Sequence, residues 1–341
     1  MINTIYFESE VRDYPKVQQI FDRFSAAQKI AIDRYGEVFN PRNQNFRLQK
    51  SNPSLILAKK HDGFVLPVPE GFGIGGRKNF YFSHMYNCIY DCRYCFLQGM
   101  YSSANYVLFV NYEDFEREIE KIIRNFNNEE ITFFSGYDCD SLALENVTGF
   151  VSHILPLFRR YPNALLELRT KSVQTIPLQS EEAMKNCIVA YSILPEAISA
   201  YLDNKVPSVK RRLETMKTLA DSGWRIGLRF DPLIHGQDWQ LLYKHLIEDV
   251  FSYIAPSQIH SISFGALRFP KKMFKKLHKL YPDEILFSGP LSTNNGSVSY
   301  KRIIEKEMVE FCQNLVKEYV SESIVFDCSF DPQVSEAETL G

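Results

Sequence analysis

Short apolar runs alternate with segments of helical periodicity from residue 79 onward, and this alternation strongly constrains the fold of the 341-residue chain. The apolar runs predict strands at Asn79–Asn87, Ile131–Tyr137, Leu165–Thr170, Cys187–Leu194, Arg225–Asp231 and Ile259–Gly265. The other segments predict helices at Tyr112–Asn125, Ser141–Tyr161, Ser180–Lys185, Ser208–Ser222, Asp238–Tyr253 and Pro270–Tyr281. Six strands alternating with helices predict an α/β fold with a parallel sheet. An open sheet and a partial barrel both fit, and both place ligands at the carboxyl ends of the strands.

The regions on either side of this pattern look different. Before it, a helix is expected at Lys16–Arg34, followed by an irregular connection rich in Asn, Pro and Gly. After it, Asn-Asn-Gly between two β-prone runs predicts a hairpin, and Lys301–Val320 predicts a closing helix. We therefore expect an N-terminal extension (1–79), an α/β core (80–282) and a C-terminal part with the hairpin, the helix and a tail (283–341).

Charge and apolar patterning narrow the class of protein. The formal net charge is −2, so a nucleic acid would have to be met by a local basic patch. The first residues lack the apolar core of a secretory signal, and no run approaches the roughly 18 apolar residues of a membrane span. We expect a cytoplasmic protein with no membrane partner. Its seven cysteines, an odd number, are then expected to be reduced.

Three of these cysteines stand close together. Cys88, Cys92 and Cys95 have the spacing C-x3-C-x2-C and directly follow the first strand of the alternating series. One tight loop with this spacing can turn three thiolates toward one centre. A 4Fe–4S cluster normally takes four cysteines, so three would leave one iron free to bind a small molecule. Two other interpretations remain: a structural zinc site, which usually has two separated ligand pairs, and cysteines that bind no metal.

This motif resembles the signature of the radical S-adenosylmethionine (radical SAM) enzymes. The resemblance implies that Cys88, Cys92 and Cys95 ligate a 4Fe–4S cluster whose unique iron is chelated by S-adenosylmethionine. It implies a partial TIM-type (β/α)6 barrel of six parallel strands. It also implies reductive cleavage of the cofactor to a 5′-deoxyadenosyl radical, with electrons from a partner such as flavodoxin or ferredoxin.

The residues around the motif resemble the spore photoproduct lyases in particular. The cysteine loop continues as CRYCFLQ, similar to the C-x-Y-C-Y-L-Q of that family. Downstream, LRTK ending at Lys171, YSI at Tyr191–Ile193 and the stretch KRRLETMKTLADSGWRIGLRFDPLIH also resemble it. The resemblance implies a DNA repair lyase that splits the carbon–carbon link of a methylene-bridged thymine dimer.

The same resemblance implies roles for individual residues. Lys171 and Ser192 match positions that hold the carboxylate of the cofactor, a task suited to a lysine ammonium. Tyr94 matches one of two loop tyrosines in the hydrogen-transfer relay. The second relay tyrosine is Phe96 here, which has no O–H to give.

The hydrogen donor is a second departure from the family. The donor cysteine of the family aligns with Tyr137, while Cys139 stands where the family has a serine near the cofactor. Residues two apart on a strand share a face, so Cys139 is a candidate donor and cofactor contact. Tyr137 is an alternative donor through its O–H. A third alternative is that the donor role is lost, and Cys139 is then a small core residue.

DNA contact would depend on local basic runs, at Lys205–Arg212 and Arg268–Lys279. The predicted hairpin is followed by Tyr300, a candidate for stacking on a base, and by Lys301 and Arg302, candidates for phosphate contact.

Two other functions remain open. One is a radical SAM enzyme for another nucleotide or a small molecule, favoured by Phe96 and Tyr137. The other is a zinc-stabilised DNA- or protein-binding module.

Overall fold

The large sheet is a curled half-barrel that confirms the partial TIM-type fold. The computed structural model describes residues 2–40, 42–69, 71–76, 78–126, 129–294 and 296–328. Its eight strands lie in the order β18 (Val325–Asp327), β14 (Ile259–Ala266), β13 (Arg225–Leu233), β11 (Cys187–Ser192), β10 (Ala164–Thr170), β9 (Ile131–Ser135), β5 (Lys78–Phe82) and β4 (Val65–Pro67). All neighbours are parallel except β4 and β5. The six predicted strands thus form a continuous parallel series, from β5 to β14.

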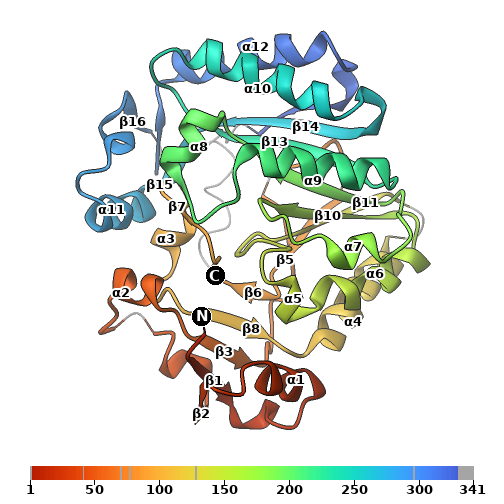
Figure 1. The fold of residues 1–341 in the computed structure, drawn as a ribbon, viewed down its shortest axis with the longest axis vertical. Helices are drawn as coiled ribbons and strands as arrows, with labels where there is room; N and C mark the ends of the chain where they lie inside the picture. The colour runs from red at the N-terminus through yellow and green to blue at the C-terminus, as the bar shows by residue number, and fades with distance from the viewer. Residues whose placement is uncertain are drawn as a thin grey trace.

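Helices cover the convex side of this sheet (Figure 1). They are α4 (Tyr112–Asn125), α5 (Glu145–Thr148), α6 (Phe150–Arg160), α7 (Ile176–Gln179), α8 (Glu196–Leu202), α9 (Val209–Asp221), α10 (Trp239–Tyr253) and α12 (Arg302–Lys317). Ser208 caps α9, since its side chain accepts a hydrogen bond from the N–H of Arg211. No helix in the described ranges is long and apolar enough to cross a membrane.

Three predicted helices need correction. The expected helix Ser141–Tyr161 is two helices, because Gly149 takes a left-handed conformation (φ 59°) between α5 and α6. The expected helix Ser180–Lys185 is wrong, since the short helix α7 precedes it. The expected helix Asp238–Tyr253 begins one residue later, as α10, because the backbone of Asp238 is left-handed (φ 55°).

The N-terminal extension is not mainly helical and irregular. The expected helix Lys16–Arg34 ends early, as α1 (Pro15–Arg23), and the chain continues as strand β2 (Gln28–Ile32). A second sheet has the order β2, β1 (Thr4–Glu8), β3 (Leu55–Ala58), β8 (Tyr106–Phe109) and β6 (Met85–Tyr86). Parallel pairing with β1 outweighs the weak helical preference of residues 28–32. Since β6 and β8 come from the expected core, this sheet crosses the boundary proposed at residue 79.

The C-terminal part contains the expected hairpin, β16 (Leu291–Asn294) and β17 (Ser297–Tyr300), which β15 (Arg268–Pro270) extends to three strands. Helix α12 confirms the closing helix, while residues 329–341 of the tail lie outside the described residues. Helix α11 (Lys271–Leu280) packs against α3 (Leu97–Met100). A Cβ on Gly99 would stand 2.7 Å from the carbonyl oxygen of Met273, so glycine is required where these helices meet.

The concave side of the half-barrel carries a buried ion pair. Glu167 on β10 and Arg229 on β13 are fully buried, with Oε2 and Nη2 2.7 Å apart. Burial alone would raise the pKa of Glu167, but the Arg229 and Arg169 guanidinium groups outweigh it and lower the pKa to about 2. Arg229 also donates to the carbonyl and hydroxyl oxygens of Ser261 on β14. One side-chain network therefore ties β10, β13 and β14 together across the intervening β11.

We expect Glu167→Gln to lower the free energy of unfolding by about 3–5 kcal/mol, because it leaves the Arg229 guanidinium buried without its carboxylate. Denaturant unfolding at pH 7 measures this loss. The exposed control Glu310→Gln, which loses an α12 surface pair with Lys306, should change stability by less than about 0.5 kcal/mol. In the wild type, the pKa of Glu167 is lower in the folded than in the unfolded chain, so its ionised form stabilises the fold above pH 4.5. This stabilisation is lost as the pH falls toward 2 and Glu167 becomes protonated. Equal stability of wild type and Glu167→Gln would contradict this role.

Candidate active site

The three cysteines lie on one loop at the carboxyl end of β5. We call residues 88–95 the cysteine loop. Cys92 is buried, and Cys88 and Cys95 are partly exposed. The loop contains the two-residue strand β7 (Asp91–Cys92), which pairs antiparallel with β12 (Asp203–Asn204). The N–H of Arg93 adds a hydrogen bond of 2.9 Å to the carbonyl of Leu202. The loop is therefore anchored to the segment that follows α8.

Side chains from distant parts of the chain hold the cysteine loop in shape. Lys50, at the end of α2 (Phe46–Ser51), donates to the carbonyl oxygen of Cys88 at 2.6 Å. Gln98 donates to the carbonyl of Cys92 and accepts from the hydroxyl of Tyr281, just after α11. The loop is thus fixed by the N-terminal extension and by the C-terminal part together.

The spacing of the thiols favours a cluster over a single metal ion. Four sulfurs around zinc at about 2.3 Å would lie about 3.8 Å apart. In the described part of the chain, one group of three possible ligands has all its donor atoms within 4.8 Å of one another, and it does not include the cysteines. A cluster binds each thiolate to a different iron and so accepts a wider spacing. Three thiolates on one loop fit as a donor set for an iron–sulfur cluster, with one iron left for another ligand.

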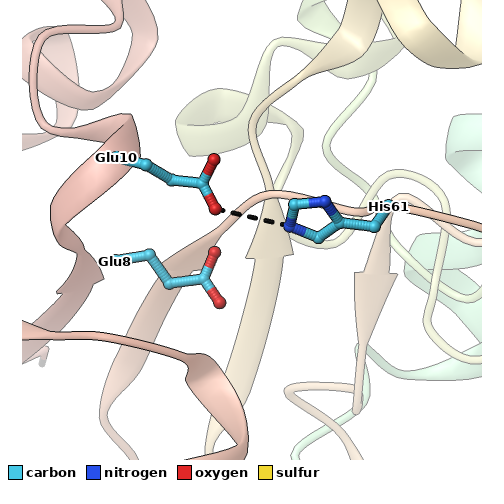
Figure 2. A group of neighbouring side chains, drawn as sticks. All are labelled: Glu8, Glu10 and His61. Atoms are coloured by element: carbon cyan, nitrogen blue, oxygen red, sulfur yellow. Dashed lines mark ion pairs between the residues drawn. The ribbon is translucent and has the colours of Figure 1, made fainter.

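The group that does converge, Glu8, Glu10 and His61, lies in the N-terminal sheet (Figure 2). The two Glu8 oxygens accept from the backbone N–H groups of Tyr35 and Lys59, each at 2.8 Å. Glu10 pairs with His61 and Lys59, each at 3.3 Å. The Glu8 oxygens and Glu10 thus already have partners, and the group joins the ends of β1 and β3.

Lys171 and Ser192 lie side by side at the carboxyl ends of β10 and β11. Thr170 pairs with Tyr191, which puts the next residues, Lys171 and Ser192, level with each other. The Lys171 ammonium lies 3.5 Å from the Cys92 sulfur and donates to the Tyr94 hydroxyl. The sheet therefore places Lys171 beside the cysteine loop and Ser192 level with it on the next strand.

Asp203 links these groups, and the sequence alone did not single it out. Its Oδ1 accepts from the Tyr94 hydroxyl and from Lys171 at 3.2 Å. Its Oδ2 accepts from Ser199 at 2.9 Å and from Arg212, which is fully buried, at 3.2 Å. Burial would raise the pKa of Asp203, but Lys171 and Arg212 hold it well below its usual range. In the sequence, Asp203 is a single acidic residue in a polar connection and belongs to no recognisable motif. Its role becomes visible only in the structure, where the β7–β12 pairing brings it to the cysteine loop.

The two candidate donors face different surroundings. Cys139 is buried, and burial raises the pKa of its thiol well above the usual value. Tyr137 is 43% exposed, and its ring lies 5.8 Å from that of Phe96 and 4.4 Å from that of Tyr81. Asp140, which follows them, accepts from the hydroxyl of Thr170 at 2.6 Å and so fixes this turn against β10.

The three predicted DNA contacts are not equivalent. Tyr300 is buried, and its hydroxyl accepts from the N–H of His235 at 2.9 Å, so its ring does not offer an open face for stacking. Lys301 and Arg302 are exposed at the beginning of α12. Of these three residues, only Lys301 and Arg302 are available to bind a phosphate in this conformation.

We expect Asp203→Asn to open the cysteine loop more often, because Lys171 and Arg212 would lose the carboxylate that neutralises both. A loss of about 2 kcal/mol from this buried network corresponds to a roughly 30-fold faster reaction of Cys92 with a thiol reagent in metal-free protein. Mass spectrometry of labelled peptides measures this rate. Asp221→Asn, which breaks an exposed pair with Lys217, is the matched control and should leave it unchanged. An unchanged rate in Asp203→Asn would show that the β7–β12 pairing and the contacts of Lys50 and Gln98 hold the loop without this carboxylate.

Comparison with known proteins agrees with the geometry. The family model "Spore photoproduct lyase" matches residues 1–289. The spore photoproduct lyase of Bacillus subtilis is 21% identical over 289 residues, covering 82% of each chain. That of Clostridium acetobutylicum is 20% identical over 291 residues, covering 83% of each.

Solved structures share the whole fold. A spore photoproduct lyase complexed with dinucleoside spore photoproduct superimposes with a TM-score of 0.83 at 15% identity, covering 97% of this chain and 99% of that one. A variant of such a lyase with bound AdoMet and dinucleoside spore photoproduct gives a TM-score of 0.82 at 16% identity over the same shares. From the extent of the family match, the chain belongs to the spore photoproduct lyase family and thereby to the radical SAM superfamily.

Proposed function

We propose that the chain is a radical SAM lyase that repairs a methylene-bridged thymine dimer in DNA. The observation that carries the proposal is the position of the three-cysteine loop, whose Cys92 sulfur lies 3.5 Å from the Lys171 ammonium at the carboxyl end of the half-barrel, in a chain of this family. Ser192 lies level with Lys171 on the next strand. The solved relatives are described with AdoMet and with the lesion bound, which supports the same ligands here.

The residues divide the work by position. When bound, the 4Fe–4S cluster and S-adenosylmethionine supply a 5′-deoxyadenosyl radical that removes a hydrogen atom from the lesion. Cys88, Cys92 and Cys95 would hold the cluster. Lys171 and Ser192 would bind the cofactor carboxylate.

The donor step is proposed for Tyr137, with Cys139 as the alternative. A donor gives one hydrogen atom to the product radical and becomes a radical itself, so it must reach the substrate side of the site. Tyr137 is partly exposed beside Phe96, whereas Cys139 is buried. Tyr94 stays a proposed relay residue whose hydroxyl is held by Asp203.

A basic surface supports DNA as the substrate. Helix α11 exposes five lysines at helical spacing, Lys271, Lys272, Lys275, Lys276 and Lys279, and carries no acidic residue. With Lys301 and Arg302 near the hairpin, it would form a local basic patch for DNA phosphates on a protein whose net charge is −2.

We also propose a cytoplasmic location and a reducing partner such as flavodoxin or ferredoxin.

A radical SAM enzyme for another nucleotide or a small molecule is the second candidate. Phe96 removes one relay hydroxyl and Tyr137 replaces the family cysteine, and both changes favour it. The zinc-stabilised module is disfavoured because the three sulfurs do not converge around one ion.

Anaerobic reconstitution should load about four irons and four sulfides per chain. Dithionite and S-adenosylmethionine should then give 5′-deoxyadenosine, and a dinucleotide spore photoproduct should be converted to thymines. Cys92→Ala should lose most of the iron, because it removes one ligand, whereas Cys312→Ala, on the buried face of α12, should keep it. Iron and 5′-deoxyadenosine without lesion repair would favour the second candidate. Zinc without 5′-deoxyadenosine would contradict both radical proposals.

Tyr137→Phe and Cys139→Ala separate the donors. We expect Tyr137→Phe to lower repaired thymine by about tenfold or more while 5′-deoxyadenosine still forms, because the product radical then lacks its hydrogen source. Cys139→Ala should lower it less. Product analysis by liquid chromatography and mass spectrometry measures both compounds. The reverse order of the two effects would assign the donor to Cys139.

A further inference from the structure

A cavity lies beside the proposed site, between the half-barrel and the N-terminal sheet. It has a volume of about 170 Å³ and a partly open mouth. We call it the tyrosine cavity, because Tyr81, Tyr86, Tyr101 and Tyr137 line it together with Lys60 and Asp138. Tyr137 connects it to the end of the cysteine loop through its ring contact with Phe96, the residue that follows the loop. A molecule in this cavity would therefore lie next to the chemistry proposed above.

The walls suit a flat ring. Tyr81 and Tyr137 pack at 4.4 Å between ring centroids, and Tyr86 and Tyr101 stack at 5.1 Å with 27° between their planes. Rings of this kind bind a nucleobase through its π face, whatever the base. The volume is well below the roughly 300–1,000 Å³ of pockets for drug-sized ligands, so it suits one six-membered ring rather than both thymines of a dimer.

The polar groups at the cavity specify what that ring must carry. Asp138 is 7% exposed, and its Oδ1 has no hydrogen-bond partner in the described part of the chain. Burial raises the pKa of Asp138, against the hydrogen bond from Ser83, the charge of the nearby Lys60 ammonium and the hydrogen bond from Tyr101, which lower it. A carboxylate oxygen accepts hydrogen bonds, so the missing partner is a donor such as a ring N–H.

Lys60 supplies the complementary group. Its ammonium is buried and donates to the hydroxyl of Tyr86 at 3.0 Å, while it lies 4.7 Å from the centroid of Phe109. An ammonium has three N–H groups, so Nζ can also donate to a ligand carbonyl. Asp138 as the acceptor and Lys60 as the donor, at one cavity, match the adjacent N–H and C=O groups of an imide. Thymine and uracil carry that edge, whereas cytosine has no ring N–H there and purines have two fused rings.

We propose that the tyrosine cavity is a binding site for a single imide pyrimidine base, with the ring N–H donating to Asp138 and a ring carbonyl accepting from Lys60. This inference deepens the proposed function and rests on it, since the base would be one thymine of the lesion. It assigns Asp138 and Lys60 as specificity residues, which recognise the thymine edge rather than the link between the two bases.

The test uses thymidine as the probe on reconstituted protein, with saturation-transfer NMR as the readout. Wild type should bind thymidine with a dissociation constant of about 1–10 mM, and Asp138→Ala should bind it at least about fivefold more weakly. N3-methylthymidine, which lacks the N–H, should show the same loss with wild type. Asp221→Ala, in exposed helix α9, is the matched control and should bind normally.

Three results would overturn the proposal: no saturation transfer to wild type at about 10 mM thymidine, equal binding of thymidine and N3-methylthymidine, or equal binding by wild type and Asp138→Ala. If Asp138→Ala fails to fold, as judged by circular dichroism, Asp138→Asn replaces it, with the same expected loss. Lesion turnover separates this failure from failure of the proposed function. Turnover without N–H-dependent thymidine binding overturns the cavity alone, whereas N–H-dependent binding without turnover overturns the repair proposal alone.

Discussion

The buried carboxylate of Asp203 joins the two halves of the site. One half is the cysteine loop, which has little regular structure of its own, and the other is the row of strand ends that carries Lys171 and Ser192. Asp203 contacts both halves, because its strand pairs with β7 and its oxygens bind Lys171 and the Tyr94 hydroxyl. Arg212 and Lys171 would repel each other without it, and neither has much access to water. The position of the thiols relative to the strand ends therefore depends on this interaction.

The half-barrel needs separate support, since an open sheet has no closing strand. Its concave side carries the Glu167–Arg229 network together with a small apolar group formed by Ile74, Ile188 and Ala190. The large apolar core lies apart from this group. A charged inner layer keeps the interior polar near the strand ends, and it costs little stability only while every charge is paired.

The order and type of the core elements followed from the sequence because each is long and strongly periodic. Helix α4 matches its predicted bounds, and the five core strands from β9 to β14 lie within a few residues of theirs. Residues 28–32 could not be assigned in the same way, since their pairing with β1 is a long-range contact. Asp203, Asp138 and Lys60 also gave no signal, because burial and partner choice, not spacing, give them their roles. The cysteine triplet and the family motifs could be read because each is a short, local stretch of the sequence.

Phe96, which follows the cysteine loop, and Tyr137 act as a pair. Phe96 has no hydroxyl, and its ring packs beside Tyr137, which carries one. Tyr94 does not offer a free hydroxyl in this conformation, because its own hydroxyl is bound by Asp203 and Lys171. A hydrogen atom from Tyr137 would then reach the product radical without passing through the loop. The tyrosine cavity gives this arrangement its substrate side, since Tyr137 lines the space in which we place the base. One aromatic residue would thus both contact the thymine and complete the reaction on it.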